Sequence, residues 1–225
     1  MILDKHNLIV IEGLDGSGKG TQTALLRERI ISSGHAVRHI SFPNYEETSA
    51  ALVKSYLAGE FGTSPDSVNA YAASSFYAVD RYAAYRKHWA SDYLGGVNIL
   101  ADRYTTSNAV YQMTKLPKDQ WEGYLTWLED YEYNLLELPA PDAVIYLDMP
   151  PQVSQRLMSG RYSGDESRKD IHEANISFQE QCRGSALYAA ERLGWNVISC
   201  CEGEQPRSID EISDEIWSAV SGCLI

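Results

Sequence analysis

The sequence has few cysteines, no long hydrophobic run and little positive charge, and each absence excludes a class of protein. Its four cysteines, Cys182, Cys200, Cys201 and Cys223, lack the spacing of metal ligands, so we expect reduced thiols. No stretch of about 18 apolar residues occurs and no signal peptide opens the chain, so we expect a cytoplasmic protein without a membrane role. Lysine and arginine number 19 against 31 acidic residues, and the resulting net charge of −12 argues against binding to a nucleic acid polymer.

The 225 residues are 44% hydrophobic and 22% charged, which is ordinary for one globular domain spanning residues 1–225. Short apolar runs alternate with longer segments of helical periodicity, which predicts an α/β fold around a parallel sheet. The apolar runs predict strands that are buried on both faces, at Leu8–Glu12, Ala36–Ser41, Val97–Ala101, Ala143–Asp148 and Trp195–Ser199. The amphipathic segments predict helices at about Gly20–Ser33, from Ser64-Pro65 to Gly95-Gly96, and at Lys118–Leu138.

A glycine-rich segment, IVIEGLDGSGKGTQ, joins the first predicted strand to the first predicted helix. Gly13, Gly18 and Lys19 match the phosphate-binding pattern G-x-x-x-x-G-K. Glycines let backbone N–H groups converge on phosphate oxygens, the helix adds its positive dipole end, and the lysine adds a charge for the β- and γ-phosphates. We therefore predict an ATP site made by Gly13, Leu14, Asp15, Gly16, Ser17, Gly18, Lys19, Gly20 and Thr21.

Gly20 stands where this pattern usually has the serine or threonine that ligates Mg²⁺. We therefore expect Mg²⁺ to be held by nucleotide phosphates, waters and a nearby carboxylate. Asp102 ends the third predicted strand, and ligands gather at the carboxyl ends of strands in such sheets. Asp102 is thus the candidate metal carboxylate, and the adjacent Arg103 can bridge two phosphate groups. A strand-terminal salt bridge is the structural alternative for this pair.

Two further segments carry residues suited to nucleotide chemistry. SSFYAVDRYAAY places Tyr77 and Arg81 on one helix face, where a ring and a guanidinium can hold a base. The plainer interpretation is a core tyrosine with a surface arginine. SGRYSGDESRKD carries Arg161, Arg168 and Lys169, and a flexible arginine-bearing loop is what phosphoryl transfer uses to cover its transition state. The plainer interpretation here is a solvated charged loop.

The chain resembles the thymidylate kinase family over nearly its whole length. The resemblance lies in an ordered set of segments: IEGLDGSGKGTQ, SFPNY, FYAVDRY, DRYTTSNAVYQ, YLDMPP and the arginine-rich lid. It implies a P-loop NTPase three-layer fold, with a five-stranded parallel sheet flanked by helices and a mobile lid at about residues 159–172. It also implies phosphoryl transfer from ATP to dTMP with Mg²⁺, giving ADP and dTDP. The family commonly forms homodimers, and the predicted helix Ser64–Leu94 offers such a face.

The resemblance assigns catalytic roles to five residues. Lys19 would sit on the transferring phosphate, and Asp15 would lie near the acceptor's 3′-hydroxyl and the metal. Arg103 would bind the acceptor phosphate. Arg161 and Arg168 match basic lid positions, and they would supply the arginine that the phosphate-binding loop lacks.

The resemblance also implies an acceptor pocket. Phe42 and Pro43 would shape this pocket, Tyr77 would stack on the thymine, and Arg81 would contact the edge of the thymine. The base and sugar side would be lined by Ser107, Tyr111 and Gln112.

Three positions depart from the family pattern near the acceptor site. Ser41 and Tyr45 stand where many relatives have arginines, and Met113 stands where a glycine often follows the YQ pair. The alternative enzyme is therefore a P-loop kinase for another nucleoside monophosphate or a deoxynucleoside. A nucleotide-dependent switch is the alternative from another class, but it needs neither a base-holding helix face nor lid arginines.

Overall fold

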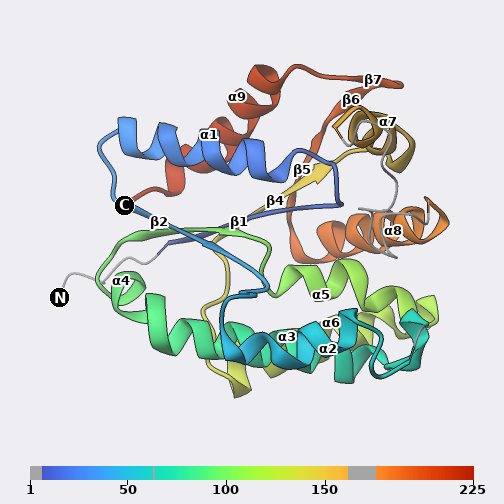
Figure 1. Ribbon diagram of the computed structural model, residues 1–225. Helices are drawn as coiled ribbons and strands as arrows, with labels where there is room; N and C mark the ends of the chain where they lie inside the picture. The colour runs from blue at the N-terminus through green and yellow to red at the C-terminus, as the bar shows by residue number, and fades with distance from the viewer. Residues whose placement is uncertain (1–6, 63, 162–175) are drawn as a thin grey trace.

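Five parallel strands form a sheet in the middle of the molecule, in the order β2-β3-β1-β4-β5 (Figure 1). The computed structural model describes residues 7–62, 64–161 and 176–225. The strands are β1 (Leu8–Gly13), β2 (Val37–Ser41), β3 (Asn98–Asp102), β4 (Ala143–Asp148) and β5 (Asn196–Ser199). All five predicted strands are confirmed, β4 with its predicted bounds and the others within one residue at either end. The expected α/β fold with a parallel sheet is therefore confirmed.

Strand β1 lies at the centre of the sheet and shows how the sequence buries both faces. All six of its residues are buried. Leu8 and Val10 belong to one core cluster, whereas Ile9 and Ile11 belong to a second cluster on the opposite face. The alternation follows from the period of a strand, in which successive side chains point to opposite faces. The edge strands β2 and β5 are partly exposed, so two buried faces hold only for the inner strands.

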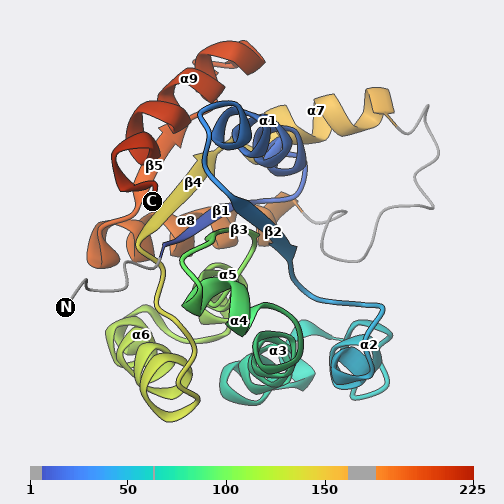
Figure 2. The same ribbon diagram turned by 90° about the vertical axis from the view of Figure 1, so that its left-hand side faces the viewer.

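Helices cover both faces of the sheet. Figure 2 shows α1 and α9 on one face and α5 and α8 on the other, with α3, α2 and α6 beyond them. The helices are α1 (Lys19–Ser32), α2 (Ala51–Leu57), α3 (Ala70–Ala84), α4 (Ala90–Leu94), α5 (Thr106–Tyr111), α6 (Trp121–Glu129), α7 (Pro151–Arg161), α8 (Ile176–Leu193) and α9 (Ile209–Val220). A short antiparallel ladder joins β6 (Cys201–Glu202) to β7 (Gln205–Pro206). No helix within these described ranges is long and apolar enough to cross a membrane.

The predicted start of the second helix is wrong. Ser64 accepts a hydrogen bond from the backbone N–H of Asp66 and caps only a short 3₁₀ turn. Helix α3 begins later, where the Asn69 side chain accepts a hydrogen bond of 2.9 Å from the N–H of Ala72. Both residues have good capping side chains, and a cap signal alone does not separate a turn from a helix.

Two π-helical segments continue helices α3 and α6. The first, Tyr85–Trp89, joins α3 to α4, which ends before Gly95 and Gly96 as predicted. The second, Asp130–Leu135, follows α6 within the predicted Lys118–Leu138 helix. Single π turns inside helices are often found at functional sites. The second segment carries a buried carboxylate that reaches the site described next.

Candidate active site

The loop between β1 and α1 has the geometry that phosphate binding requires. Gly18 caps α1 with φ 91°, in the left-handed region that favours glycine. No side chain caps the first turn of α1, so its backbone N–H groups are open to a ligand. At Gly13 an added Cβ would lie 2.6 Å from Ser17 Oγ and 3.1 Å from the Leu147 carbonyl oxygen. Glycine is thus required there because neighbouring atoms come too close.

Lys19 is buried beneath this loop. Its Nζ donates to the Leu14 carbonyl at 2.9 Å and lies 3.7 Å from Asp15 Oδ1. Burial, with the nearby Arg103 charge, lowers the pKa of Lys19 to about 8, although neighbouring carboxylates oppose this. A phosphate at this place would supply negative charge and favour the protonated lysine. The charged form of Lys19 is therefore disfavoured mainly by burial.

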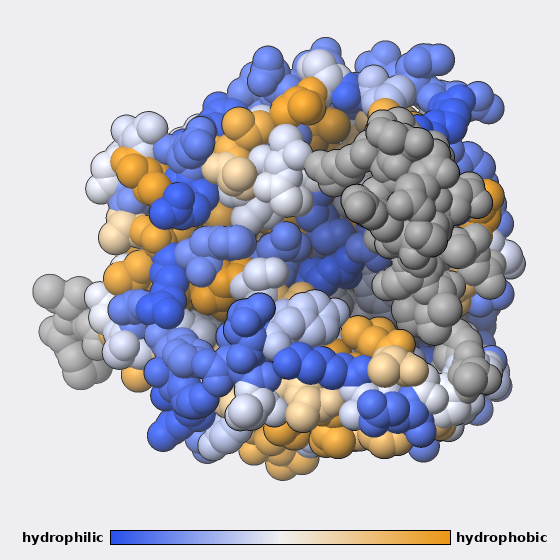
Figure 3. All heavy atoms as spheres, viewed as in Figure 1, coloured by the Kyte–Doolittle hydropathy of each residue, from blue (hydrophilic) through white to orange (hydrophobic). Residues whose placement is uncertain are grey.

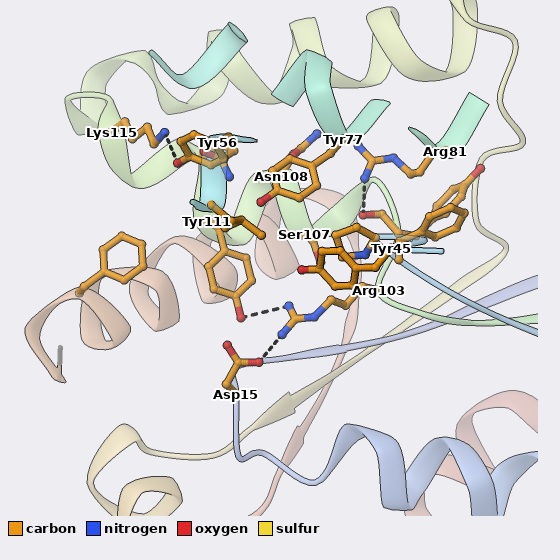
Figure 4. A pocket seen from close by; sticks show the side chains of 16 residues that line it. Asp15, Tyr45, Tyr56, Tyr77, Arg81, Arg103, Ser107, Asn108, Tyr111 and Lys115 are labelled. Atoms are coloured by element: carbon orange, nitrogen blue, oxygen red, sulfur yellow. Dashed lines mark hydrogen bonds and ion pairs between the residues drawn. The ribbon is translucent and has the colours of Figure 1, made fainter. Parts of the chain in front are cut away.

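Arg103 occupies the corner between the phosphate loop and helix α5. Its Nη2 donates to Asp15 Oδ1 at 2.5 Å and its Nη1 to the Tyr111 hydroxyl at 3.0 Å (Figure 4). Glu12 Oε1 lies 3.6 Å from Nη1. The backbone at Arg103 has φ 64°, a left-handed conformation that is uncommon for a residue with a side chain. This strained position aims the guanidinium across the end of the sheet, toward the loop.

Two cavities meet at this corner. The smaller, about 260 Å³, is rich in aromatic side chains and extends between α3, α5 and the loop after β2. The larger, about 710 Å³, lies along the phosphate loop. Asp15, Phe42 and Arg103 line both cavities. On the face seen in Figure 1, Figure 3 shows a hollow with a hydrophilic lining where β1 meets α1. The two cavities therefore adjoin at these three residues.

Helix α3 lines the smaller cavity with Tyr77 and Arg81. Arg81 is only 1% exposed, so the alternative of a surface arginine is wrong. Its Nε and Nη2 donate to Glu132 at 2.7 and 2.5 Å, and its Nη1 donates to the Tyr104 carbonyl at 3.3 Å. Two parallel N–H···O bonds of this kind fix the plane of a guanidinium.

The loop after β2 forms another wall of the smaller cavity and is fastened to α3. Asp80, one turn from Tyr77, accepts hydrogen bonds from the Asn44 N–H at 2.8 Å and from Ser49 Oγ at 2.6 Å. Phe42 and Pro43, joined by a cis peptide bond, line the cavity just before this anchor. Helix α3, which carries Tyr77, thus fixes the position of this loop.

Comparisons with known proteins agree with this arrangement. A family model described as "Thymidylate kinase" matches residues 11–216. The chain belongs to the thymidylate kinase family. Thymidylate kinase from Mycobacterium tuberculosis (strain ATCC 25618 / H37Rv) is 32% identical over 192 residues, which cover 84% of this chain and 87% of that one. The Plasmodium falciparum (isolate 3D7) protein of the same name is 30% identical over 180 residues, 79% of each chain.

A solved thymidylate kinase from Candida albicans has the same fold. It superposes with a TM-score of 0.71 at 20% identity, covering 97% of this chain and 92% of that chain. The predicted fold and enzyme class, a P-loop kinase of the thymidylate kinase family, are therefore confirmed. Phosphoryl transfer to dTMP is the activity that goes with this family assignment.

The structure brings together most of the residues expected to form the thymidylate kinase site. The smaller cavity is lined by Asp15, Phe42, Pro43, Tyr77, Arg81, Arg103, Ser107, Tyr111 and Gln112, all predicted for the acceptor. The larger is lined by the predicted Asp15, Gly16, Gly18, Lys19, Gly20, Thr21 and Asp102. Gly13, Leu14 and Ser17 belong to the loop but are buried behind this lining. The roles of these residues stay predictions.

The predicted lid falls largely outside the described residues. Helix α7 continues to Arg161, so the first residues of the predicted lid, 159–161, are helical. The Arg161 side chain and the whole of Arg168 lie outside the described part of the chain.

Five charged or amide residues in and around the two cavities were not predicted from the sequence. They are Glu12, Asp80, Asn108, Lys115 and Glu132. Glu12 is fully buried, and it accepts hydrogen bonds from the Gly13 N–H and from the hydroxyls of two α5 residues. A signal existed for Glu132, because the core spacing that continues from α6 places a carboxylate at a core position. A buried carboxylate needs a partner, and the sequence does not say which one.

Proposed function

We propose that this chain transfers the γ-phosphoryl group of ATP to dTMP, giving ADP and dTDP in the synthesis of dTTP. The observation that carries the proposal is the wall shared by the two cavities, made by Asp15, Phe42 and Arg103. Phosphoryl transfer needs the acceptor oxygen in line with the γ-phosphorus. Two cavities that meet at a corner with an arginine suit this requirement.

The proposed chemistry depends on positioning and charge. A phosphate oxygen of the acceptor attacks the γ-phosphorus, the bond to the β-phosphate oxygen breaks, and ADP leaves with that oxygen. Lys19 holds the transferring phosphate from the loop side, and Arg103 holds the acceptor phosphate from the other side. Asp15 keeps Arg103 in place at 2.5 Å. With substrates bound, Asp15 would lie near the acceptor's 3′-hydroxyl and would help to hold the metal. The protein thus compensates negative charge on both reactants.

We propose that the acceptor's base occupies the aromatic cavity. Tyr77 stacks on the thymine, and Arg81 contacts its edge from a fixed plane. Phe42 and Pro43 bound the pocket at the loop after β2. The base and sugar side is formed by Ser107, Tyr111 and Gln112, all of which line this cavity. A cavity that combines aromatic rings with hydrogen-bonding side chains suits a nucleoside base.

Asp102 is the proposed Mg²⁺ carboxylate. Within residues 7–62, 64–161 and 176–225 no group of three His, Cys, Asp or Glu side chains is arranged to hold a metal. Mg²⁺ in phosphate sites usually takes one or two carboxylates with phosphates and waters, so Asp102, in the cavity beside Gly20, fits this mode. When bound, Mg²⁺ neutralises charge on the β- and γ-phosphate oxygens.

The proposed lid arginines complete the charge compensation. Arg161 is the last residue of α7, Arg168 comes seven residues later in the sequence, and the larger cavity is lined by Leu157 from the same helix. A cavity bordered by α7 supports a role for basic residues at and after the end of this helix. The phosphate loop itself has Gly16 and Ser17 where some relatives carry a basic residue.

We further propose a cytoplasmic homodimer. Helix α3 has an exposed stripe with Tyr71, Val79 and Tyr82 at 40%, 46% and 41% exposure, and Leu52 of α2 is 45% exposed. Apolar residues gathered on neighbouring helices suit burial against a second copy. The cysteines in the structure are all free, which suits a reducing compartment. Sedimentation equilibrium would find a monomer if this stripe is not an interface.

An acceptor panel tests the proposed reaction. Purified protein would receive ATP, Mg²⁺ and one acceptor from a set containing dTMP, dUMP, dCMP, dGMP, dAMP and thymidine, with ADP formation measured. We expect dTMP to have the highest kcat/KM, and Lys19→Ala to give background rates with every acceptor. ADP formation that does not depend on any acceptor would indicate a nucleotide switch and would overturn the proposal.

A further inference from the structure

Glu132 is a fully buried carboxylate behind the aromatic cavity, and it belongs to the π-helical segment after α6. It accepts two hydrogen bonds from Arg81 and one of 3.0 Å from Asn108 Nδ2. Both of these partners line the cavity where we propose that the acceptor's base binds, whereas Glu132 itself does not. Glu132 therefore acts on the base through the two residues that it holds.

Glu132 fixes which way round the Asn108 amide lies. Asn108 Nδ2 faces Glu132 Oε1 at 3.0 Å and the Ser74 carbonyl oxygen at 3.3 Å. A carboxylate and a carbonyl only accept hydrogen bonds, so the amide nitrogen, with its two hydrogens, must face them. The Asn108 oxygen is then the atom left to face the cavity. At this point the pocket offers a hydrogen-bond acceptor.

Glu132 also fixes the Arg81 guanidinium. The paired contacts to Nε and Nη2 hold its plane, and Nη1 is directed to the Tyr104 carbonyl. The guanidinium has N–H groups beyond those that these contacts use, and it can only donate. Arg81 and Asn108 both line the cavity and share the same carboxylate oxygen, Glu132 Oε1. Arg81 can thus offer a donor, and Asn108 an acceptor, to the same cavity.

We propose that Glu132 is a positioning residue that sets this donor–acceptor order, and that the order selects bases with an adjacent C=O and N–H. This inference rests on the proposed function. Thymine and uracil carry such an edge, with O4 as acceptor and N3–H as donor. Cytosine carries the reverse edge, with an amino donor at C4 and an unprotonated N3. A site that leaves buried polar groups unpaired rejects the wrong base strongly.

Substituting Glu132 should therefore change base preference more than rate. In Glu132→Gln one carboxylate oxygen becomes an N–H₂ group, which cannot accept a hydrogen bond, so at least one of the bonds that Arg81 and Asn108 donate to Glu132 is lost and their orientation is no longer fixed. The variant also loses the negative charge that held Arg81. The pocket then no longer favours one order of donor and acceptor.

The test compares kcat/KM for dTMP, dUMP and dCMP in the wild type, Glu132→Gln, Glu132→Asp and Glu129→Gln. Glu129 is an exposed carboxylate on α6, so its substitution is the matched control. We expect wild type to prefer dTMP and dUMP to dCMP. In Glu132→Gln the dTMP-to-dCMP ratio should fall by about 10- to 100-fold, with dUMP following dTMP. Glu129→Gln should leave the ratio within about 2-fold of wild type.

The outcomes separate positioning from a purely structural role. An equal loss for all three acceptors in Glu132→Gln would show that the residue only supports the fold, and an unchanged ratio would also overturn the inference. If thermal melting shows that Glu132→Gln is unfolded, Glu132→Asp decides. Its carboxylate keeps the charge but is one methylene too short to reach both Arg81 and Asn108, so its ratio should still fall. Wild type without activity on dTMP contradicts the proposed function, whereas wild type active on dTMP and dCMP alike contradicts only this inference.

Discussion

Arg103 combines a strained backbone with a functional side chain, and two substitutions can separate these contributions. Its φ of 64° lies in the left-handed region, while its guanidinium contacts Asp15 and Tyr111 between the two cavities. Arg103→Ala removes the guanidinium and keeps the strain. Arg103→Gly removes both. The two variants should therefore lose the same activity but differ in stability.

The size of this difference follows from the backbone conformation. A residue with a Cβ pays about 1–2 kcal/mol in the left-handed region, and glycine does not. Glycine loses about 0.5–1 kcal/mol more chain entropy on folding than alanine does. The net expectation is that Arg103→Gly is more stable than Arg103→Ala by about 0.5–1 kcal/mol. For a chain of this length that corresponds to a melting difference of about 1–4 °C.

Urea unfolding of the nucleotide-free variants measures this difference, and a kinase assay measures the activity. We expect kcat/KM for dTMP to fall about 10²- to 10³-fold in both variants, because a charged donor to a phosphate oxygen is lost. Thr126, exposed in helix α6, provides the control. There the Thr126→Gly protein should be less stable than the Thr126→Ala protein by about 1 kcal/mol. An Arg103→Ala protein as stable as Arg103→Gly would refute the argument from strain.

Three other predictions concern single residues. Lys19→Ala should abolish ATP turnover while the folded state persists, because the lysine donates only to one loop carbonyl; undiminished turnover would contradict its role. Arg161→Ala and Arg168→Ala should lower kcat far more than they raise KM, by up to about 10³-fold, and wild-type rates in both would remove the lid from the mechanism. Burial lowers the pKa of Lys115 from 10.5 to about 8, so the unfolded state binds more protons between these values and stability rises with pH across that window. The free energy of unfolding in urea, measured for wild type and for Lys115→Met, should differ by an amount that rises between pH 8 and pH 10. A difference that does not change with pH would contradict this prediction.

The sheet could be predicted because each strand has a local signal in the sequence, a short apolar run. Apolar runs such as Leu8–Gly13 and Ala143–Asp148 have one stable place, the buried interior of a parallel sheet. The phosphate loop was predictable for the same reason, since its glycines and Lys19 act within one short segment. Helix starts were less certain, because Ser64 and Asn69 carry equally good capping side chains.

The partners of the site's charged groups could not be predicted, because they come from distant segments. Arg81 pairs with Glu132, 51 residues away, and Arg103 with Asp15, 88 residues away. A sequence shows that Arg81 shares a helix face with Tyr77, but only packing shows that it is buried and held by a carboxylate. The same is true of Asp80, whose role as a hydrogen-bond acceptor becomes visible only when the loop after β2 lies against α3.

The central strand has a consequence for synthesis on the ribosome. Strand β1 pairs with β3 and β4, so its hydrogen-bonding partners are residues Ile99–Asp102 and Ala143–Leu147. Strand β1 cannot complete its pairing until both β3 and β4 have been synthesised, which takes about 7–30 s at a translation speed of about 5–20 residues per second. A nascent chain released before β4 lacks one flank of β1 and therefore cannot hold the adjoining loop around a nucleotide.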